Sequence, residues 1–182
     1  MEDCEITRLK KDMRKLMKER LRNNADRADS SNRVCKALLC LPEFINASTI
    51  LAFSPMHSEV DITSIYDDRF LFPYIGDGKM RYSTPPLEKG KMGFYEPKEK
   101  LDIDYETAVI LVPALAFSKD LRRLGRGGGF YDRYLEENRD KVFSIGLSFE
   151  MNLLDVIPYD HHDQTLDMII TEKRIITRQG QY

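Results

Sequence analysis

A run of glycines and arginines in the second half of the chain has the residue types of a phosphate-binding loop. The stretch reads Arg122-Arg123-Leu124-Gly125-Arg126-Gly127-Gly128-Gly129-Phe130-Tyr131-Asp132-Arg133. Glycines leave backbone N–H groups unshielded by side chains, and arginines supply forked cationic donors that fit phosphate oxygens. The pattern therefore predicts a polyphosphate site. The alternative is a tight surface turn whose arginines are merely solvated.

The segments on either side of this loop predict a strand before it and a helix after it. The first half of the apolar run 108–117 is aliphatic and β-branched, which is typical of a strand buried on both faces. After the loop, Phe130, Tyr134 and Leu135 recur at helical spacing, and Asp132 suits a first helical turn. A helix that begins at the loop adds N–H donors and a positive dipole end, which favour anions.

The loop differs from two well-known phosphate-binding motifs. A Walker A motif needs Gly-Lys followed by Ser or Thr, but Gly78-Lys79 and Gly90-Lys91 are each followed by methionine. The dinucleotide fingerprint needs its last glycine at the position of Phe130. The sequence therefore predicts phosphate binding by a loop of another kind.

The stretch from Arg123 to Arg133, with Val-Pro-Ala-Leu-Ala-Phe at 112–117, resembles the 5-formyltetrahydrofolate cyclo-ligase (methenyltetrahydrofolate synthetase) family. The similarity extends over nearly the whole chain. It implies ATP- and Mg²⁺-dependent conversion of 5-formyltetrahydrofolate to 5,10-methenyltetrahydrofolate, with release of ADP and phosphate. Two other functions remain open: another ATP-dependent small-molecule kinase or ligase on the same scaffold, and a non-catalytic module that binds RNA or phosphoprotein through its arginines.

The resemblance also implies which residues bind the substrates. Lys10 and Arg14 match a Lys-x-x-x-Arg motif, and residues four apart share one face of a helix; from spacing alone, this basic face is merely solvated. The implied ATP contacts are Lys10, Lys11, Asp12, Met13 and Arg14, followed by Arg123, Leu124, Gly125, Arg126, Gly127, Gly128, Gly129, Phe130 and Tyr131. The implied folate contacts are Ser54, Glu59, Arg126, Gly127, Gly128, Gly129 and Phe130. Arg126 is the expected catalytic residue, bound to the transferring phosphoryl group.

Two aspartates, Asp132 and Asp163, match the magnesium contacts of the resembled family. Magnesium on a triphosphate needs few protein carboxylates, because phosphate and water fill the other positions. His161 and His162 could also bind a metal, but adjacent loop histidines are more often surface residues. His57-x-Glu59 lacks the Pro-Cys-x-x-Cys that zinc deaminases require. The expected cofactor is thus Mg²⁺, with ATP as co-substrate.

Four positions depart from residues that the resembled family often carries. Ser118 stands where Asp is frequent, and Leu121 stands where Gly is frequent, just before the arginines. Phe130 replaces a common Tyr, and Asn152 replaces a common Gln. None of the implied catalytic or metal residues is altered by these departures.

Periodicity along the rest of the chain predicts alternating helices and strands. Apolar residues at helical steps predict a first helix: Ile6, Leu9, Met13, Leu16, Met17 and Leu21. A second helix is expected over 31–40 with Asp29 or Ser30 as its cap, and a short one over 61–67. Strands are expected at 49–53, 142–149 and 168–171, with short β pieces at 69–73, 79–82 and 92–95 and a loop at 97–106. The aromatic residues between 69 and 95 are assigned to the core.

This alternation, in 182 residues, favours a single α/β domain over 1–182. The resemblance makes it a three-layer α/β/α domain with a largely parallel central sheet. Lys and Arg total 28 against 30 Asp and Glu, and the net charge of −2 gives no case for nucleic-acid binding.

The sequence also carries expectations about location and partners. No apolar run approaches the ~20 residues that span a membrane, and the first residues contain no apolar signal core. The three cysteines, Cys4, Cys35 and Cys40, form no Cys-x-x-Cys pair. We therefore expect a cytoplasmic protein whose partners are small molecules, with no obligate protein partner.

Overall fold

A computed structural model describes residues 3–21, 26–90 and 93–181, and its centre is an eight-stranded sheet. The pairings from β11 to β2 are parallel, whereas the pairings at both edges are antiparallel. The prediction of a largely parallel sheet is therefore confirmed. In spatial order the strands are β13 (Gly180–Gln181), β12 (Ile175–Thr177), β11 (Met168–Ile170), β9 (Val142–Leu147), β6 (Ala108–Val112), β1 (Ile50–Leu51), β2 (Phe70–Gly76) and β3 (Lys79–Ser83).

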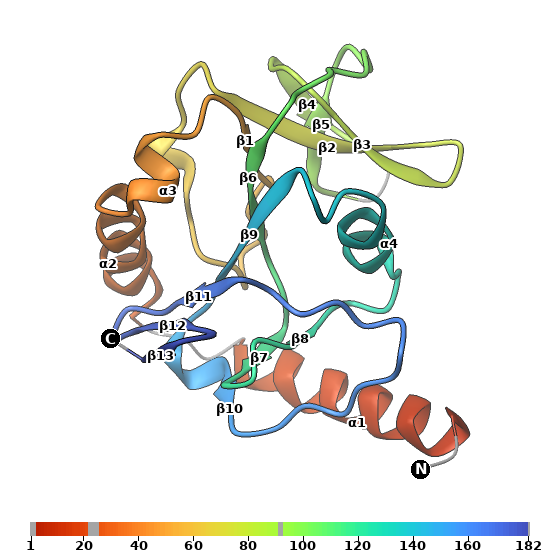
Figure 1. Cartoon of the computed structure of the whole chain (residues 1–182). Coiled ribbons are helices and arrows are strands. Elements are labelled where there is room, and N and C mark those ends of the chain that lie inside the picture. The colour runs from red at the N-terminus through yellow and green to blue at the C-terminus, as the bar shows by residue number, and fades with distance from the viewer. Residues whose placement is uncertain (1–2, 22–25, 91–92, 182) are drawn as a thin grey trace.

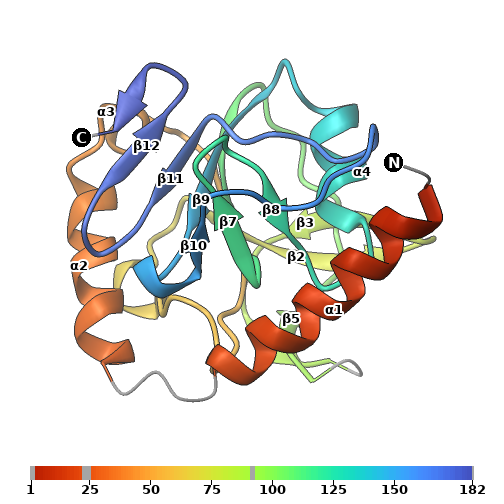
Figure 2. The same cartoon turned by 90° about the horizontal axis from the view of Figure 1, so that it is seen from below.

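Helices cover both faces of this sheet, as Figure 1 shows. Helices α2 (Arg27–Leu39) and α3 (Pro42–Ile45) lie on one face, and α4 (Phe130–Glu137) lies on the other. Helix α1 (Asp3–Leu21) crosses the end of the sheet and lies in front in Figure 2. The buried apolar side chains form two clusters, one with Leu38 of α2 and one with Leu135 of α4. The layers confirm the expected α/β/α architecture.

Strand β6 explains the most apolar stretch of the sequence. All its residues are buried, because β1 and β9 pair with it on either side and helices cover both faces. The expected strand at 49–53 is shorter, and only Ile50–Leu51 pairs as β1.

None of the described helices is both long enough and apolar enough to cross a membrane.

A second, three-stranded sheet carries the start of the glycine loop. Strand β7 (Ala116–Ser118) pairs in parallel with β10 (Leu153–Leu154) and antiparallel with β8 (Arg123–Leu124). Arg123 and Leu124, which the sequence placed in the loop, thus belong to a buried strand. The preceding turn forms with a leucine: Leu121 has φ 65°, a left-handed conformation that favours glycine, and its buried side chain packs against the sheet.

Some expected element boundaries are wrong. Helix α2 begins at Arg27, not at residue 31, and its N-cap residue is Asp26, which makes no side-chain capping bond. The expected cap Asp29 lies inside the helix and pairs with Arg33 one turn later. The expected helix at 61–67 is only a 3-10 turn, η1 (Thr63–Ile65). Strand β4 (Leu87–Lys89), which was not predicted, pairs with β5 (Tyr95–Pro97); Met92 of the expected piece at 92–95 lies outside the described residues.

Candidate active site

A cavity of about 330 Å³ lies where the glycine loop meets the ends of β1 and β6. Open α/β sheets bind their ligands at this edge, beyond the carboxyl ends of the parallel strands. The lining is mainly apolar with a few charged groups, which is typical of small-molecule sites. The lining residues are Phe53, Ser54, Met56, Glu59, Pro73, Tyr74, Ile75, Met80, Phe94, Pro113, Ala114, Arg123, Gly125, Arg126, Gly128, Gly129, Phe130, Tyr131 and Asp132.

This lining contains most of the loop residues that the sequence predicted, and it adds two aromatic residues that were assigned to no site. Tyr74 and Phe94 belong to the aromatic segment that was assigned entirely to the core, yet both line the cavity. Tyr74 is itself 5% exposed, so it is buried in the fold and still contributes to the cavity wall. No pattern along the sequence separates cavity-lining aromatics from core aromatics, because both are apolar.

The glycine loop turns sharply before α4. Gly127 has φ 104° and Gly129, the N-cap residue of α4, has φ 64°, both in the region that side chains rarely adopt. A Cβ atom at Gly129 would also lie 2.8 Å from the Arg133 guanidinium. The glycines therefore let the chain enter α4 with its first N–H groups open, as the phosphate-loop hypothesis requires.

Glu59, an expected folate contact, and Arg126, the expected catalytic residue, bind each other. Glu59 Oε1 accepts hydrogen bonds from Arg126 Nη2 at 2.9 Å and from Nε at 3.3 Å. Arg126 Nη2 also donates to Ser58 Oγ at 3.0 Å, a contact that the sequence did not predict. The Glu59 side chain is only 7% exposed, whereas that of Arg126 is 36% exposed. The arginine is the more accessible partner for an incoming ligand.

Arg123 is buried and supports Asp132. Its side chain is 3% exposed, and it donates to Asp132 Oδ1 at 2.6 Å and to the Gln164 carbonyl at 2.7 Å. Burial lowers the pKa of Arg123, and the Asp132 carboxylate opposes this shift. Arg123 was expected to contact ATP; it borders the cavity, and its guanidinium is engaged by Asp132 and by the segment that carries Asp163. Sequence could not distinguish it from Arg126, since all the arginines of the loop look alike without burial.

Lys10 lies between two carboxylates. Its Nζ donates to Asp160 Oδ2 at 2.7 Å and also to Asp163 Oδ2. Burial tends to lower the pKa of Lys10, but its bonds to Asp160 and Asp163 outweigh burial and raise it. The bond from Lys10 in turn lowers the pKa of Asp160. Asp160 was not predicted from the sequence as a site residue. The pattern that could have indicated it is a second carboxylate three positions before Asp163 in the same turn.

The rest of the predicted α1 motif divides into two groups. Arg14 Nε donates to the Gly125 carbonyl at 2.9 Å and Lys10 bonds to Asp163, so both residues lie on one face of α1, as their spacing predicted, and this face is turned to the loop and the Asp163 segment. Lys11 and Asp12 are exposed and do not line the cavity, and Met13 packs against the core. The side chain of Leu124 is also in the core, which leaves only its backbone for a ligand.

The two expected metal ligands lie on neighbouring segments. Asp132 Oδ1 accepts the N–H of Gln164, the residue after Asp163, at 3.1 Å. Asp132 Oδ2 and Asp163 Oδ1 accept no hydrogen bond from the described residues. No group of three or more His, Cys, Asp or Glu side chains suited to a metal occurs among those residues. The donor set fits magnesium carried by a triphosphate, which takes its other ligands from phosphate and water.

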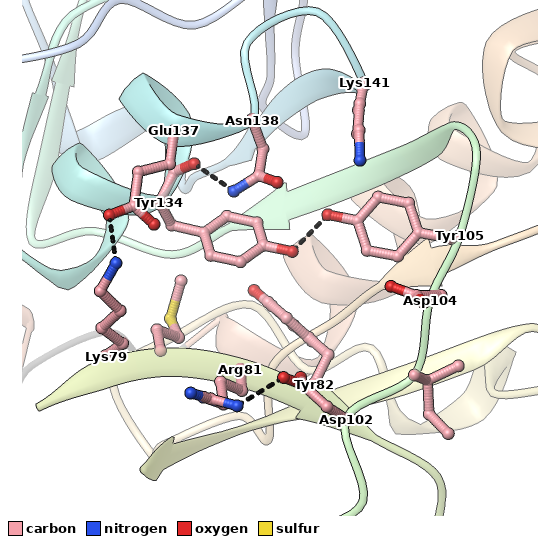
Figure 3. A pocket seen from close by; sticks show the side chains of 12 residues that line it. Lys79, Arg81, Tyr82, Asp102, Asp104, Tyr105, Tyr134, Glu137, Asn138 and Lys141 are labelled. Carbon is pink, nitrogen blue, oxygen red and sulfur yellow. Dashed lines mark hydrogen bonds and ion pairs between the residues drawn. The ribbon is translucent and has the colours of Figure 1, made fainter. Parts of the chain in front are cut away.

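A second cavity, of about 280 Å³, lies between β3 and the C-terminal end of α4 (Figure 3). Ion pairs of Lys79 with Glu137 at 2.8 Å and of Arg81 with Asp102 at 2.6 Å flank it. The hydroxyls of Tyr105 and Tyr134 bond to each other inside it. None of the predicted site residues lines this cavity. The predicted site residues that line either of these two cavities therefore line the first one, whereas Lys10, Arg14 and Asp163 lie outside its lining.

Comparison with known proteins identifies the family to which the chain belongs. The sequence model of the 5-formyltetrahydrofolate cyclo-ligase family matches residues 6–172. A probable 5-formyltetrahydrofolate cyclo-ligase of Schizosaccharomyces pombe is 27% identical in an alignment 197 residues long, gaps included, which covers 92% of this chain and 97% of that protein. The 5-formyltetrahydrofolate cyclo-ligase of Mycolicibacterium smegmatis is 33% identical over 150 residues, which cover 71% of this chain and 76% of that protein.

Solved structures share the fold. The NMR structure of the 5,10-methenyltetrahydrofolate synthetase of Aquifex aeolicus superposes with a TM-score of 0.81 at 28% identity and covers 94% of each chain. A synthetase structure from Mycoplasma pneumoniae, at 20% identity, has a TM-score of 0.66 and covers 90% of this chain and 98% of that one. The second similarity concerns the fold alone.

Proposed function

Because the chain belongs to the 5-formyltetrahydrofolate cyclo-ligase family, we propose that it converts 5-formyltetrahydrofolate to 5,10-methenyltetrahydrofolate with ATP. ADP and phosphate are the other products. The observation that carries the proposal is the convergence of Glu59 and Arg126, 67 positions apart, on one cavity that the glycine loop borders. This convergence supports a site that takes a pterin and a phosphoryl group side by side.

The reaction requires the protein to position the two substrates and to stabilise the charge that develops. The formyl oxygen attacks the terminal phosphoryl group of ATP, so that an O–P bond forms and ADP leaves. The neighbouring folate nitrogen then attacks the activated carbon and loses its proton, and phosphate leaves with the former formyl oxygen. A poor leaving group is thereby made a good one. Such phosphoryl transfer depends mainly on orientation and on donors aimed at developing charge.

Each charged residue of the site has a role in this proposal. Arg126 releases the Glu59 carboxylate and binds the transferring phosphoryl group with its planar guanidinium. Glu59 then accepts N–H donors of the pterin. Lys10 and Arg14, on one face of α1, bind the remaining phosphates. The backbone N–H groups of Gly127, Gly128 and Gly129 face these phosphates in the proposed complex.

Magnesium is part of the proposal, and Asp132 and Asp163 would hold it. When bound, the ion neutralises charge on the phosphates. Arg123 keeps Asp132 in place through one carboxylate oxygen, and Lys10 does the same for Asp163. His161 and His162, whose rings lie 3.8 Å apart on the surface, take no part in metal binding.

We further propose that residues 1–182 form one domain in the cytoplasm, with small-molecule substrates and no obligate protein partner. The eight-stranded sheet supports the proposal of a single domain, since it contains both β1, from the first third of the chain, and β13, near its end. The free thiols of Cys4, Cys35 and Cys40 support a reducing location.

The test is absorbance of the purified protein with ATP, magnesium and 5-formyltetrahydrofolate. We expect the methenyl chromophore to appear in proportion to ADP released. ATP turnover without this chromophore would instead indicate another kinase or ligase. RNA binding that falls steeply with salt, without ATP turnover, would indicate a non-catalytic module. Either result would contradict the proposed function.

A further inference from the structure

We propose that Arg27, at the start of α2, is a positioning residue for Glu59. Arg27 does not line the cavity and touches no expected ligand atom. It holds the backbone of the turn from Met56 to Glu59, and this turn presents the Glu59 carboxylate to the cavity. The inference rests on the proposed function, because it matters to activity only if Glu59 binds the folate.

The contacts of Arg27 are directed at both ends of this turn. Its Nε donates to the Glu59 carbonyl at 3.0 Å, and its Nη2 donates to the Met56 carbonyl at 3.3 Å. The Arg27 side chain is 24% exposed, so water competes with these bonds only in part. An ion pair of Nη1 with Asp61 at 3.8 Å is long and partly exposed, and contributes less. The planar fork thus spans two carbonyls that are three residues apart.

The turn itself fixes the Glu59 carboxylate. The Glu59 N–H donates to the Met56 carbonyl at 2.9 Å, and the Met56 N–H donates to Glu59 Oε2 at 3.0 Å. Oε1 is left to point at Arg126 in the cavity. Arg27 holds this turn from the α2 side and Arg126 holds it from the cavity side. If a ligand takes Arg126 away, the Arg27 bonds remain as a support that does not depend on the ligand.

The same face of α2 extends this support along the following residues. Ser31 Oγ accepts the Asp61 N–H at 3.0 Å, and the Cys35 thiol donates to the Asp61 carbonyl at 3.4 Å. Arg27, Ser31 and Cys35 are four residues apart, which places them on one face of the helix. This face therefore binds the segment from Met56 to Asp61, and Arg27 is the member that reaches the turn of Glu59.

Removal of Arg27 should loosen the carboxylate without removing it. The bond between Glu59 N–H and the Met56 carbonyl keeps the turn folded, but two carbonyls lose a charged donor. A binding group must be held within fractions of an ångström of its productive position, so a loosened Glu59 binds the pterin less well. ATP, which is assigned to Lys10, Arg14 and Arg126, should be affected little.

The experiment compares Arg27→Met, which keeps an apolar stem but has no donors, with the wild-type protein. We expect the KM for 5-formyltetrahydrofolate to rise roughly tenfold, the effect of losing one hydrogen bond to a charged group. The KM for ATP and the kcat at saturating folate should change little. Arg27→Lys, with one flexible ammonium, should recover part of the loss. Arg33→Met is the matched control, because Arg33 lies on the same helix and, among the described residues, forms an ion pair with Asp29 alone, on the surface.

Two outcomes would contradict the positioning role. One is an unchanged KM for folate in Arg27→Met; the other is an equal rise in both KM values, which would indicate general loosening of the fold. Calorimetric titration of folate without ATP gives the same comparison without turnover, and Arg27→Lys serves if Arg27→Met does not fold. A wild-type protein that forms no methenyl product would contradict the proposed function instead, so the two failures are distinguishable.

Discussion

Glu59 Oε1 lies 2.9 Å from Arg126 Nη2, so the carboxylate assigned to the folate and the guanidinium assigned to the phosphoryl group form one ion pair. A guanidinium that turns to a phosphoryl group must give up this carboxylate. The carboxylate is then available to the pterin. Under the proposed roles, binding of the two substrates would be coupled through this contact, which makes Arg126 the first residue to test.

Arg126→Ala should lose roughly 100- to 1,000-fold in kcat at saturating ATP, the usual effect of removing one donor to developing charge. The protein should stay folded, because the Arg126 side chain is partly exposed and Glu59 keeps its bond from the Met56 N–H. Arg126→Lys should also be poor, since a point charge does not replace a planar fork. Arg81→Ala, beside the second cavity, is the control. A kcat of Arg126→Ala within about twofold of wild type would exclude Arg126 from the mechanism.

Arg123→Ala should instead destabilise the fold. The guanidinium is buried against Asp132 and the Gln164 carbonyl, and removal of one partner of a buried pair costs about 3 kcal/mol or more in the free energy of unfolding. Denaturant titration of Arg123→Ala and Arg126→Ala gives the comparison. Equal free energies of unfolding for the two variants would contradict the distinction between a supporting and an exposed arginine.

Substitutions of Glu59 and of the α1 residues should separate by substrate. Glu59→Gln should weaken folate binding far more than ATP binding, whereas Lys10→Ala and Arg14→Ala should do the reverse. Calorimetric titration with a non-hydrolysable ATP analogue and with the folate measures both affinities. Normal nucleotide binding by both α1 variants would mean that Lys10 and Arg14 only anchor the helix to Asp160, Asp163 and Gly125.

Asp163→Asn should raise the magnesium concentration needed for nucleotide binding by roughly tenfold or more. An amide oxygen is a weaker ligand than a carboxylate, and Lys10 keeps Asp160 as its partner. Titration of Mn²⁺ in the presence of the ATP analogue, followed by electron paramagnetic resonance, reports the metal without turnover. His161→Ala should leave the metal affinity unchanged. Wild-type metal affinity in Asp163→Asn would exclude this carboxylate as a ligand.

The bond between Lys10 and Asp160 predicts a loss of stability in acid. The pKa of Asp160 is lowered in the fold, so its contribution is present above its unfolded value of about 3.9 and is lost as pH falls through the folded value. The pKa of Lys10 is raised, so its contribution persists at neutral pH. Asp160→Asn should therefore lower the free energy of unfolding by about 1 kcal/mol at pH 7.

This difference between wild type and Asp160→Asn should shrink as the pH falls below about 4 and should disappear only below the folded pKa of Asp160, which is lower still. Thermal unfolding at several pH values measures it. Asp155→Asn, at an exposed carboxylate that pairs with Lys119, is the control and should change little. A difference that does not shrink at all between pH 7 and pH 3 would show that the Asp160 side chain stabilises α1 by some means other than its charge.

Features that depend on neighbours along the chain were predictable from the order of residues alone. The buried run of β6, the glycines at positive φ and the apolar spacing of α4 predicted strand, loop and helix in their order. Residues four apart on one helix, Lys10 and Arg14, were also placed correctly on one face. These are local properties, since backbone sterics and helical periodicity act over a few residues.

Residues of the same type that look equivalent along the chain differ in burial and in partners, and only the folded structure shows these differences. Arg123 and Arg126 are three positions apart in one loop motif, yet one is buried against Asp132 and the other pairs with Glu59 at the cavity. Asp160, which the sequence passed over, meets Lys10 across 150 positions, and Arg27 reaches a turn that starts 29 positions away. Burial and long-range contacts follow from the order of strands in the sheet, and no pattern along the chain encodes that order locally.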